Sequence, residues 1–531
     1  MSFQQLLDNL MDQTWRQSLP GFAPEAVLAA TIVLMLLVRL FRWGQGVNIS
    51  ALALVGTAVA CTLAYFQLHD ANPFVGAGLV APPAESVARP LPIFSGLLVY
   101  DEFTIFFRLF LTFFGTLVIW LTMISGIPDR EDSPDFYTLL LGALVGMCLM
   151  ASANHLLMLF IGVEMASVPS YAMAGFLKGR RQSSEASLKY VVYGAGAAGV
   201  MLYGISLLAG LFGTMHLPSL AGAMAETLSG TAGFTPEVRV TLLAVLMVLV
   251  GIAFKLSAVP FHFWCPDVFE GASAEVAAFL SVASKGAALA LLVRFSLAVT
   301  GTSAEGLADV RLHLGAAIAV LAAVTTTFGN MAAYAQTNLK RLLAYSTIAH
   351  AGYMMMPIAA SLRTPEAAVL GVQAMLFYLV VYLFMNLGAF AVVVFIRNEI
   401  GSEELKDYRG LWRRCPGLTV CMVIFLASLT GIPPLGGFAA KFVVFLALVQ
   451  AKLWWLVVVA GVNTVISVFY YWRVLRAMIL EEGPEAEPAP SLGMGSIAGV
   501  YTAALALSVF VLGIWFNELS EFTQSIASVL F

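Results

Sequence analysis

The stretch FKLSAVPFHFW, residues 254–264, closes a long apolar run that begins near Val240. Lys255 lies deep in this run, and Pro260 and His262 follow shortly after it. A proline inside a helix removes one backbone hydrogen bond and clashes with the preceding turn. The stretch therefore predicts a helix that carries a lysine and is interrupted just after it.

The composition predicts the environment of this helix. The chain has 531 residues, of which 60% are hydrophobic and 11% charged, and its mean hydropathy is +0.89. Soluble domains are about half apolar and about a quarter charged. Apolar runs of about 18 to 25 residues recur along the chain, without the alternation of a β-barrel. We therefore expect an all-α polytopic membrane protein in the lipid bilayer, and the net charge of −4 gives no indication of nucleic-acid binding.

The apolar runs predict about fourteen transmembrane helices, at residues 24–42, 48–66, 101–126, 135–153, 155–177, 185–212, 239–260, 272–298, 311–331, 339–360, 368–397, 416–448, 452–478 and 495–517. Lysine and arginine concentrate in alternate loops, which face the cytoplasm. This asymmetry, with an even number of spans, predicts that both termini lie on the outer (periplasmic) side. We expect a bacterial cell (inner) membrane rather than a thylakoid or mitochondrial one.

Two segments of five spans each, 135–298 and 311–480, both contain an interrupted fourth span. The second interruption is LTGIPPLGGFAAKF, residues 429–442. Because five is an odd number, the two copies must run in opposite senses, which predicts inverted five-helix repeats with sites near mid-membrane. The rest divides into an N-terminal three-helix segment with an outer loop, 1–134, and an acidic loop with a C-terminal helix, 481–531. We expect the Pro- and Gly-rich residues 67–100 to lie against the outer surface, and 481–490 to be a solvated connector.

Ionisable residues inside the predicted spans are the candidate functional groups. A charge at the bilayer centre costs roughly 2.5 to 3.5 kcal/mol on insertion scales, so it needs a polar interior and a function. Four lie well inside, and two lie nearer the ends of their spans: Glu164, Lys255, Lys285 and Lys441, then Lys189 and His350.

These groups predict proton transfer. If the carboxylate of Glu164 moves or gains a proton, a neighbouring Lys255 loses its counter-charge and tends to release its own proton. Lys285 would accept protons further along, and Lys441 would pass them out. His262 follows Lys255 by two helical turns, about 10 Å, which water could bridge where Pro260 frees backbone carbonyls. The alternative is that such charges form structural ion pairs, and this alternative is preferred for Arg108, together with snorkelling.

Three stretches resemble the antiporter-like membrane subunits of proton-pumping NADH:quinone oxidoreductase (respiratory complex I). They are FKLSAVPFHFWCPDVFEGASAEVAAFLSVASK, GNMAAYAQTNLKRLLAYSTIAHAGYMMM and GIPPLGGFAAKF, and the similarity spans residues 135–480. The form FKL..PFHFW.PDV..GA resembles the subunit N branch of that family. Cys265 stands where threonine is common and Ser273 where proline is common, which puts the local loop shape in doubt.

The resemblance implies roles for individual residues. Glu164 matches the glutamate that pairs with the lysine of the broken seventh span, which Lys255 matches. Lys285 matches the lysine that continues the central axis, and Lys441 the exit-side lysine of the broken twelfth span. Lys189 and His262 match a sixth-span lysine and a histidine of the family.

The resemblance also implies partners and cofactors. NADH, FMN, iron–sulfur clusters and quinone belong to partner subunits, and this chain would bind no cofactor. No dinucleotide fingerprint follows a strand, and the five scattered cysteines have no cluster or metal spacing. Its neighbours would be sister antiporter-like subunits and small membrane subunits. The expected function is proton translocation coupled to electron transfer from NADH to quinone. A multisubunit Na⁺/H⁺ antiporter subunit, a membrane-bound hydrogenase-type subunit and a structural scaffold are the alternatives.

Overall fold

The computed structural model describes residues 4–5, 11–40, 47–69, 90–128, 132–228, 235–301, 307–483 and 493–531. The N-terminal third contains η1 Thr14–Ser18, α2 Leu19–Gly21, α3 Ala23–Leu40, α4 Ile49–Leu68, β1 Leu91–Ile93, β2 Leu98–Tyr100, α6 Glu102–Ser125, α7 Ser133–Ser152 and α8 Leu156–Ala174. The middle contains α9 Arg181–Phe212, α10 Leu217–Leu228, α11 Pro236–Leu256, α12 Trp264–Gly271, α13 Ala274–Thr300, α14 Ala308–Ala333 and α15 Leu339–Ser361. The last part contains α16 Pro365–Ile400, η4 Leu405–Tyr408, α17 Leu411–Arg414, α18 Pro416–Thr430, α19 Gly436–Gln450, α20 Trp454–Ile479, α21 Ile497–Ile514 and α22 Phe516–Ser528.

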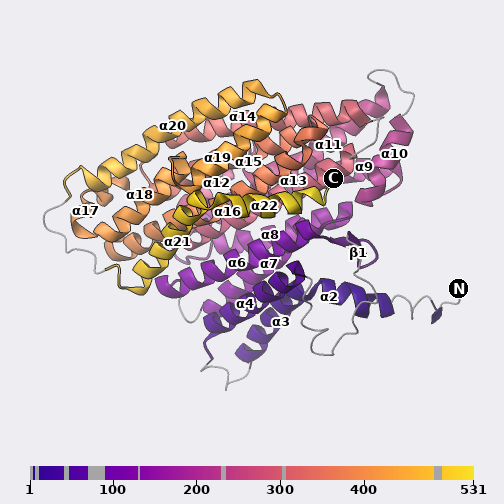
Figure 1. Cartoon of the computed structure of the whole chain (residues 1–531). Coiled ribbons are helices and arrows are strands. Elements are labelled where there is room, and N and C mark those ends of the chain that lie inside the picture. The colour runs from indigo at the N-terminus through magenta and orange to yellow at the C-terminus, as the bar shows by residue number, and fades with distance from the viewer. Residues whose placement is uncertain are drawn as a thin grey trace.

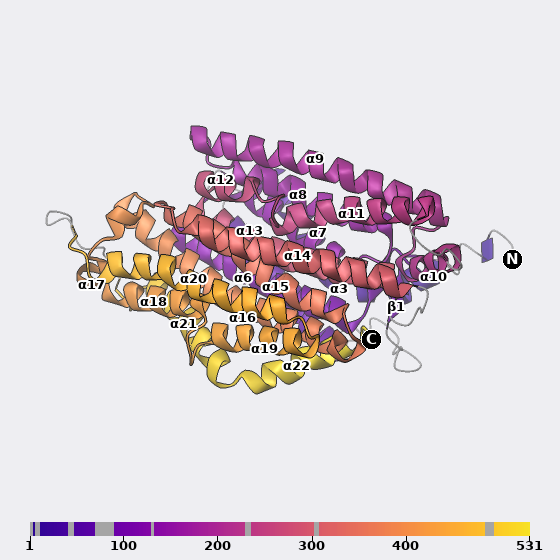
Figure 2. The same cartoon turned by 90° about the horizontal axis from the view of Figure 1, so that it is seen from above.

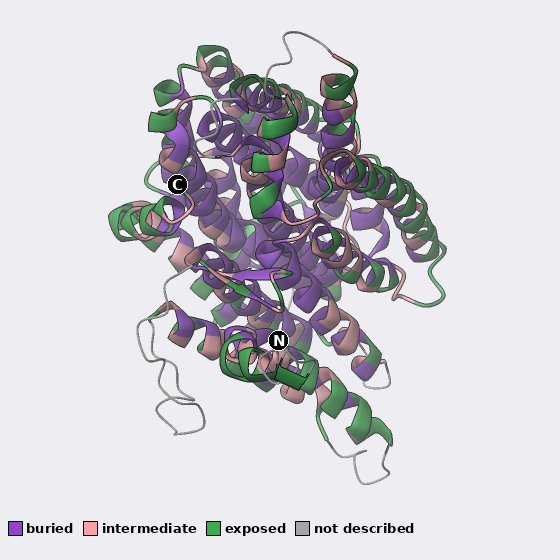
Figure 3. Cartoon of the chain, turned by 90° about the vertical axis from the view of Figure 1, so that its right-hand side faces the viewer, coloured by how far each residue is buried: buried purple, intermediate pink, exposed green. Residues whose placement is uncertain are grey.

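The long helices lie side by side in one elongated bundle (Figure 1). Seen from above, α9 runs along one edge and α22 along the opposite edge, with α13 and α14 between them (Figure 2). The short helix α17 and the antiparallel hairpin of β1 and β2 mark opposite ends of the bundle. Buried residues fill the centre, and the exposed ones lie on the outer helices (Figure 3). Those outer helices carry many exposed apolar side chains, such as Leu188 and Val192 on α9, as expected of a surface that contacts lipid.

The prediction of an all-helical membrane protein is confirmed. Within the described residues, twelve helices of 18 to 36 residues are long and apolar enough to cross a membrane. Two predicted spans are not among the twelve. The span at 339–360 is α15, whose basic and hydroxyl side chains lower its hydropathy, and the span at 416–448 is the pair of shorter helices α18 and α19. The count of fourteen therefore stays a prediction.

Both predicted interruptions are present. α11 ends at Leu256 and α12 begins at Trp264, while α18 ends at Thr430 and α19 begins at Gly436. Each half packs in a similar order: α7 against α8 and α14 against α15, then α9 against α11 and α12, and α16 against α18 and α19. This similarity supports the repeat, and the inversion and the domain limits stay predictions.

Several shorter elements were not predicted from the sequence, among them α10, the β1–β2 hairpin and α22. The hairpin occupies the end of the proline-rich stretch 67–100, of which residues 70–89 lie outside the described residues. Of the acidic stretch 481–490, Glu481 pairs with Arg409 at 2.8 Å, and residues 484–490 lie outside the described residues.

Candidate functional site

At the first interruption, side chains from neighbouring segments form hydrogen bonds with backbone groups that the broken helix leaves without partners. A broken helix leaves backbone groups without intrahelical partners, which is costly inside a membrane unless they are satisfied otherwise. Trp264 Nε1 donates to the carbonyl oxygen of Phe254 at 3.0 Å. The backbone N–H of Val259 donates to Thr325 Oγ1 on α14, also at 3.0 Å. Ser257 ends α11 in the left-handed conformation, with φ of 59°.

Lys255 is fully buried at the end of α11. Its Nζ donates to Ser167 Oγ on α8 at 2.9 Å. Ser167 lies three residues after Glu164 on the same helix, and its hydroxyl donates to the carbonyl oxygen of Val163 at 2.6 Å. Glu164 is partly exposed and within electrostatic range of Lys255, but no ion pair within 4.0 Å joins the two in the described chain. The predicted pair is thus coupled electrostatically, and Ser167 holds Lys255 against the helix that carries Glu164.

Lys285 is fully buried in α13 and lies against the first interruption. Its Nζ donates to Ser257 Oγ at 2.8 Å and lies 4.7 Å from the centre of the Trp264 ring and 5.7 Å from that of Phe269. These rings stabilise a cation over their faces. Because Ser257 follows Lys255 by two residues, the broken segment connects the two lysines, which also interact electrostatically.

Cys265 and Ser273, which depart from the family pattern, both lie close to the residues of the interruption. Ser273 is the N-cap of α13, and its Oγ accepts from the backbone N–H of Val276 at 3.3 Å. Cys265 is buried in α12, within electrostatic range of both Lys285 and Tyr382. The serine thus starts the helix that carries Lys285, and the thiol lies between the two halves of the chain.

His350 is buried in α15 and is the centre of a tyrosine cluster. Its Nδ1 lies 2.7 Å from Tyr378 Oη, and its Nε2 lies 3.2 Å from Tyr471 Oη. The ring of Tyr382 is 5.3 Å away, centre to centre. The sequence did not predict these tyrosines, although a tyrosine in an apolar span usually needs a hydrogen-bond partner for its hydroxyl. This need for a partner was the feature of the sequence that could have identified the tyrosines as candidates.

Lys441 lies at the second interruption. Its Nζ donates to the carbonyl oxygen of Thr430 at 2.8 Å and lies 4.8 Å from the centre of the Tyr353 ring. The Tyr353 ring is 6.1 Å from that of His350. Gly431 has φ of 93°, and a Cβ there would lie 2.9 Å from Lys441 Cδ, so glycine makes room for the lysine.

These groups form a nearly continuous row, which we call the central axis: Glu164, Ser167, Lys255, Ser257, Lys285, Cys265, Tyr382, His350, Tyr378, Tyr471, Tyr353 and Lys441. It runs across both halves of the chain. In the described residues, none of its three lysines has a carboxylate within 4.0 Å. A row of buried protonatable groups without ion pairs can hold and relay protons.

Two predicted residues lie off this axis. His262 is buried against Phe263 and Phe328, with ring centres 4.5 Å apart in both cases, and its Nδ1 has no partner in the described residues. Lys189 pairs with Glu185 at 2.9 Å and Asp267 at 2.7 Å.

Lys189 belongs to a cluster of charged side chains at the cytoplasmic end of the predicted topology, which connects three helices. Arg341 also contacts Asp267 at 2.7 Å, and it reaches Glu270 at 2.6 Å. We call Glu185, Lys189, Asp267, Glu270 and Arg341 the loop ion cluster. It joins α9, α12 and α15, so it supports α12, the short helix that follows the first interruption.

Arg108 has the structural role preferred from the sequence, without snorkelling. Its Nε pairs with Glu25 at 2.6 Å, and one of its Nη atoms donates to the carbonyl oxygen of Gly21 at 2.6 Å. Both charged side chains are completely buried. The pair joins α6 to α3 and lies apart from the central axis.

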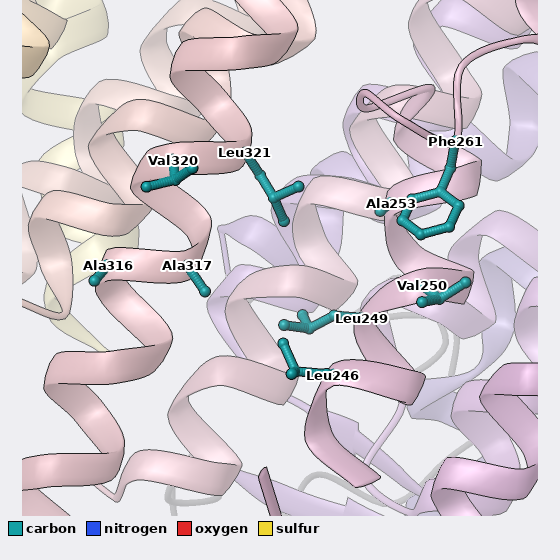
Figure 4. Close-up of a pocket in the computed structure, with 9 residues that line it drawn as sticks. All are labelled: Leu246, Leu249, Val250, Ala253, Phe261, Ala316, Ala317, Val320 and Leu321. Atoms are coloured by element: carbon teal, nitrogen blue, oxygen red, sulfur yellow. The ribbon is translucent and has the colours of Figure 1, made fainter. Parts of the chain in front are cut away.

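The structure also contains an apolar groove between α11 and α14 (Figure 4). Its lining is entirely hydrocarbon, including Leu249, Phe261 and Val320. This lining offers no side chain that could relay a proton. In the described residues, no three His, Cys, Asp or Glu side chains are grouped so that they could hold a metal ion.

Comparison with known proteins gives three consistent results. Residues 153–467 match the family model described as NADH:quinone oxidoreductase/Mrp antiporter, transmembrane. A protein of Anaeromyxobacter sp. (strain Fw109-5) named NADH-quinone oxidoreductase subunit N is 40% identical over 97% of this chain and 98% of its own length. Subunit N 2 of Sorangium cellulosum is 39% identical over 97% and 98%.

Solved structures show the same fold. A chain of respiratory complex I from Thermus thermophilus is 30% identical, with a TM-score of 0.71, over 94% of this chain and 98% of that chain. A chain of the Mrp complex from Dietzia sp. DQ12-45-1b is 20% identical, with a TM-score of 0.75, over 97% and 98%. At that identity the second likeness concerns the fold alone.

Proposed function

The chain belongs to the family of NADH:quinone oxidoreductase and Mrp antiporter membrane subunits, and from this premise we propose that it translocates protons as subunit N of an NADH-quinone oxidoreductase. The observation that carries the proposal is the central axis. Lys255, Lys285 and Lys441 are buried without carboxylate partners within 4.0 Å in the described residues. Buried lysines that are not in ion pairs are expensive structural elements, so a function in proton transfer explains their presence.

The proposed transfer begins at Glu164. A change in its charge alters the electrostatic environment of Lys255, which the hydrogen bond to Ser167 holds against the helix of Glu164. Loss of the positive charge at Lys255 removes its repulsion of Lys285, which then takes up a proton more readily. The tyrosine cluster around His350 lies between Lys285 and Lys441, which passes the proton out. Each step uses groups of this chain and the polar interior around them.

We propose that the redox chemistry takes place in partner subunits. NADH, FMN, iron–sulfur clusters and quinone would belong to them, and their electron transfer would drive this chain. Sister antiporter-like subunits and small membrane subunits would complete the membrane part. The relative with 40% identity and the complex I chain with 30% identity support this placement.

We further propose a bacterial cell (inner) membrane, with both termini periplasmic. The basic residues of the loops support this orientation, since Arg341, Arg397 and Arg409 lie in or beside loops on one side of the predicted topology. The Na⁺/H⁺ antiporter and hydrogenase-type alternatives use the same fold. The Mrp chain and a chain of the membrane-bound sulfane sulfur reductase share 20% identity each, so the closer sequence relationship to subunit N favours the first function.

The proposal is tested with Lys255→Ala in membrane vesicles. NADH-driven quinone reduction and proton uptake should both fall while the complex stays assembled. Lys406→Ala is the matched control, because this lysine is exposed in η4 and lies outside the central axis. Unchanged reduction and uptake in Lys255→Ala would remove Lys255 from the mechanism and leave it a structural charge.

A further inference from the structure

Glu275 is a buried carboxylate that the central axis does not use. It lies in the first turn of α13 and is completely buried. Neither of its carboxylate oxygens has a hydrogen-bond partner in the described residues. An ionised carboxylate in such a place is costly unless a cation compensates it, and a protonated one is less costly. The position therefore calls for a compensating positive charge close to the carboxylate.

A cation is available beside it. Lys340, in the first turn of α15, is 2% exposed, and its Nζ donates to the carbonyl oxygen of Ala272 at 2.7 Å. Ala272 precedes Glu275 by three residues, and Lys340 and Glu275 attract each other electrostatically. Lys340 thus lies at the base of the helix that carries Glu275.

The other partner of Lys340 reaches towards the surface. Glu403, in the loop after α16, lies 3.0 Å from Lys340 Nζ and is 14% exposed. Arg397 lies 3.5 Å from the same carboxylate. Lys340 is therefore placed between an accessible carboxylate and a fully buried one. On its far side Glu275 is within electrostatic range of Tyr137 on α7, whose hydroxyl lies 2.9 Å from Thr122 Oγ1.

The interior beyond Glu275 is also polar. Six residues further along α13, about 9 Å by helix rise, Ser281 Oγ accepts from Asn386 Nδ2 on α16 at 2.6 Å. Asn386 Oδ1 has no partner in the described residues. Ser281 and Lys285 are four residues apart, so they share one face of α13. Further polar groups thus lie along α13 between the level of Glu275 and that of Lys285.

We propose that Glu275 is a proton-binding group at the inner end of an uptake branch that runs from Glu403 through Lys340 and supplies Lys285. The branch rests on the proposed function, because it needs the central axis as its acceptor. A proton taken up at Glu403 passes to Lys340 as Lys340 gives one of its own protons to Glu275, so that Lys340 keeps its charge, and the proton then passes inward from Glu275. The branch supplies the proton that Lys285 takes up once Lys255 has lost its charge.

The test compares Glu275→Gln with Glu275→Asp in the whole complex. Gln keeps the shape but cannot ionise, so NADH-driven proton uptake should slow by roughly tenfold or more, as for loss of a positioned proton-transfer group. Asp keeps the carboxyl and should retain most of the rate. Glu270→Gln is the matched control, since it removes one carboxylate from the loop ion cluster at the same end of the bundle.

A spectroscopic measurement separates proton binding from a structural role. Infrared difference spectra of the complex, recorded on reduction with NADH, should contain a carboxyl C=O band that shifts in Glu275→Asp and is absent in Glu275→Gln. Identical carboxyl bands in all three proteins would overturn the proposal. The Asp variant keeps the charge opposite Lys340, so it serves even if the Gln variant does not assemble.

The same experiments distinguish the two proposals. If Lys255→Ala abolishes uptake while Glu275→Gln has normal uptake and normal spectra, the central axis stands and the branch is wrong. If Glu275→Gln slows uptake while Lys255→Ala has no effect, the axis as drawn is wrong and protons enter elsewhere.

Discussion

Ser167→Ala tests whether the hydrogen bond that holds Lys255 against the helix of Glu164 is needed for proton uptake. The hydroxyl of Ser167 accepts the hydrogen bond from Lys255 Nζ at 2.9 Å. A hydrogen bond to a charged group contributes roughly 1.5 to 3 kcal/mol net. Since each 1.36 kcal/mol corresponds to about a tenfold change in rate, loss of this contact should slow NADH-driven proton uptake by between roughly tenfold and a hundredfold. The assay is initial proton uptake and quinone reduction in vesicles with equal amounts of assembled complex.

Ser170→Ala is the control for this measurement. Ser170 lies on the same helix, is also buried, and donates to the carbonyl oxygen of Ala166 at 2.6 Å, as Ser167 does to that of Val163. The two variants therefore lose the same local bond, and they differ in the contact with Lys255. Ser167→Thr keeps the hydroxyl and should restore activity. Equal rates in Ser167→Ala and Ser170→Ala would show that the hydrogen bond between Ser167 and Lys255 is not needed for proton uptake.

Three further predictions concern stability. Arg108→Met leaves the buried Glu25 unpaired, so we expect the free energy of unfolding to fall by roughly 3 to 5 kcal/mol, with partial recovery when Glu25→Gln is added; thermal unfolding in detergent measures both, and an unchanged midpoint would contradict it. Gly437→Ala places a Cβ 1.8 Å from a backbone oxygen of α18, so it should prevent assembly, whereas Gly461→Ala, with nothing within 4 Å, should assemble normally. Burial and a nearby histidine hold the pKa of His155 below its ordinary value of 6.5, so its stabilising contribution is present above that value and is lost as the pH falls; His155→Asn should lessen this loss in unfolding measured from pH 8 to pH 5, and equal pH profiles would contradict it.

The sequence predicted the helix breaks because proline and glycine act locally. Pro260 follows the end of α11 by four residues and prevents the helix from continuing, and the run GIPPL, residues 431–435, separates α18 from α19, whatever the neighbouring helices do. Lys255, Lys285 and Lys441 could be identified for a similar reason, since a charge in an apolar run is visible in one dimension. The hydrogen-bond partners could not be predicted, because Ser167 and Ser257 are ordinary residues until the fold brings lysines to them.

Lys189 shows that the position of a residue along a predicted span does not reveal its partners. Its place near the start of a predicted span suggested a role in proton transfer. In the structure, Lys189 pairs with Asp267 in the loop ion cluster. That carboxylate comes from a helix 78 residues later in the chain. Conversely, Glu275 has no proline or glycine beside it and sits at a predicted span boundary, where a carboxylate suggests a solvated end. Its burial depends on the packing of α13 against α7, α15 and α16, which the sequence does not state.

The partners of the three lysines differ in a way that bears on the mechanism. A carbonyl oxygen can only accept, so Thr430 serves Lys441 while the lysine donates. Ser167 already donates its hydroxyl proton to Val163, and so it is likewise an acceptor for Lys255. The hydroxyl of Ser257 can turn, accepting from a charged Lys285 and donating to a neutral one. Lys285 can therefore change protonation state without losing its partner, and this places the most readily reversible step at the middle of the axis, where the proposed branch from Glu275 arrives.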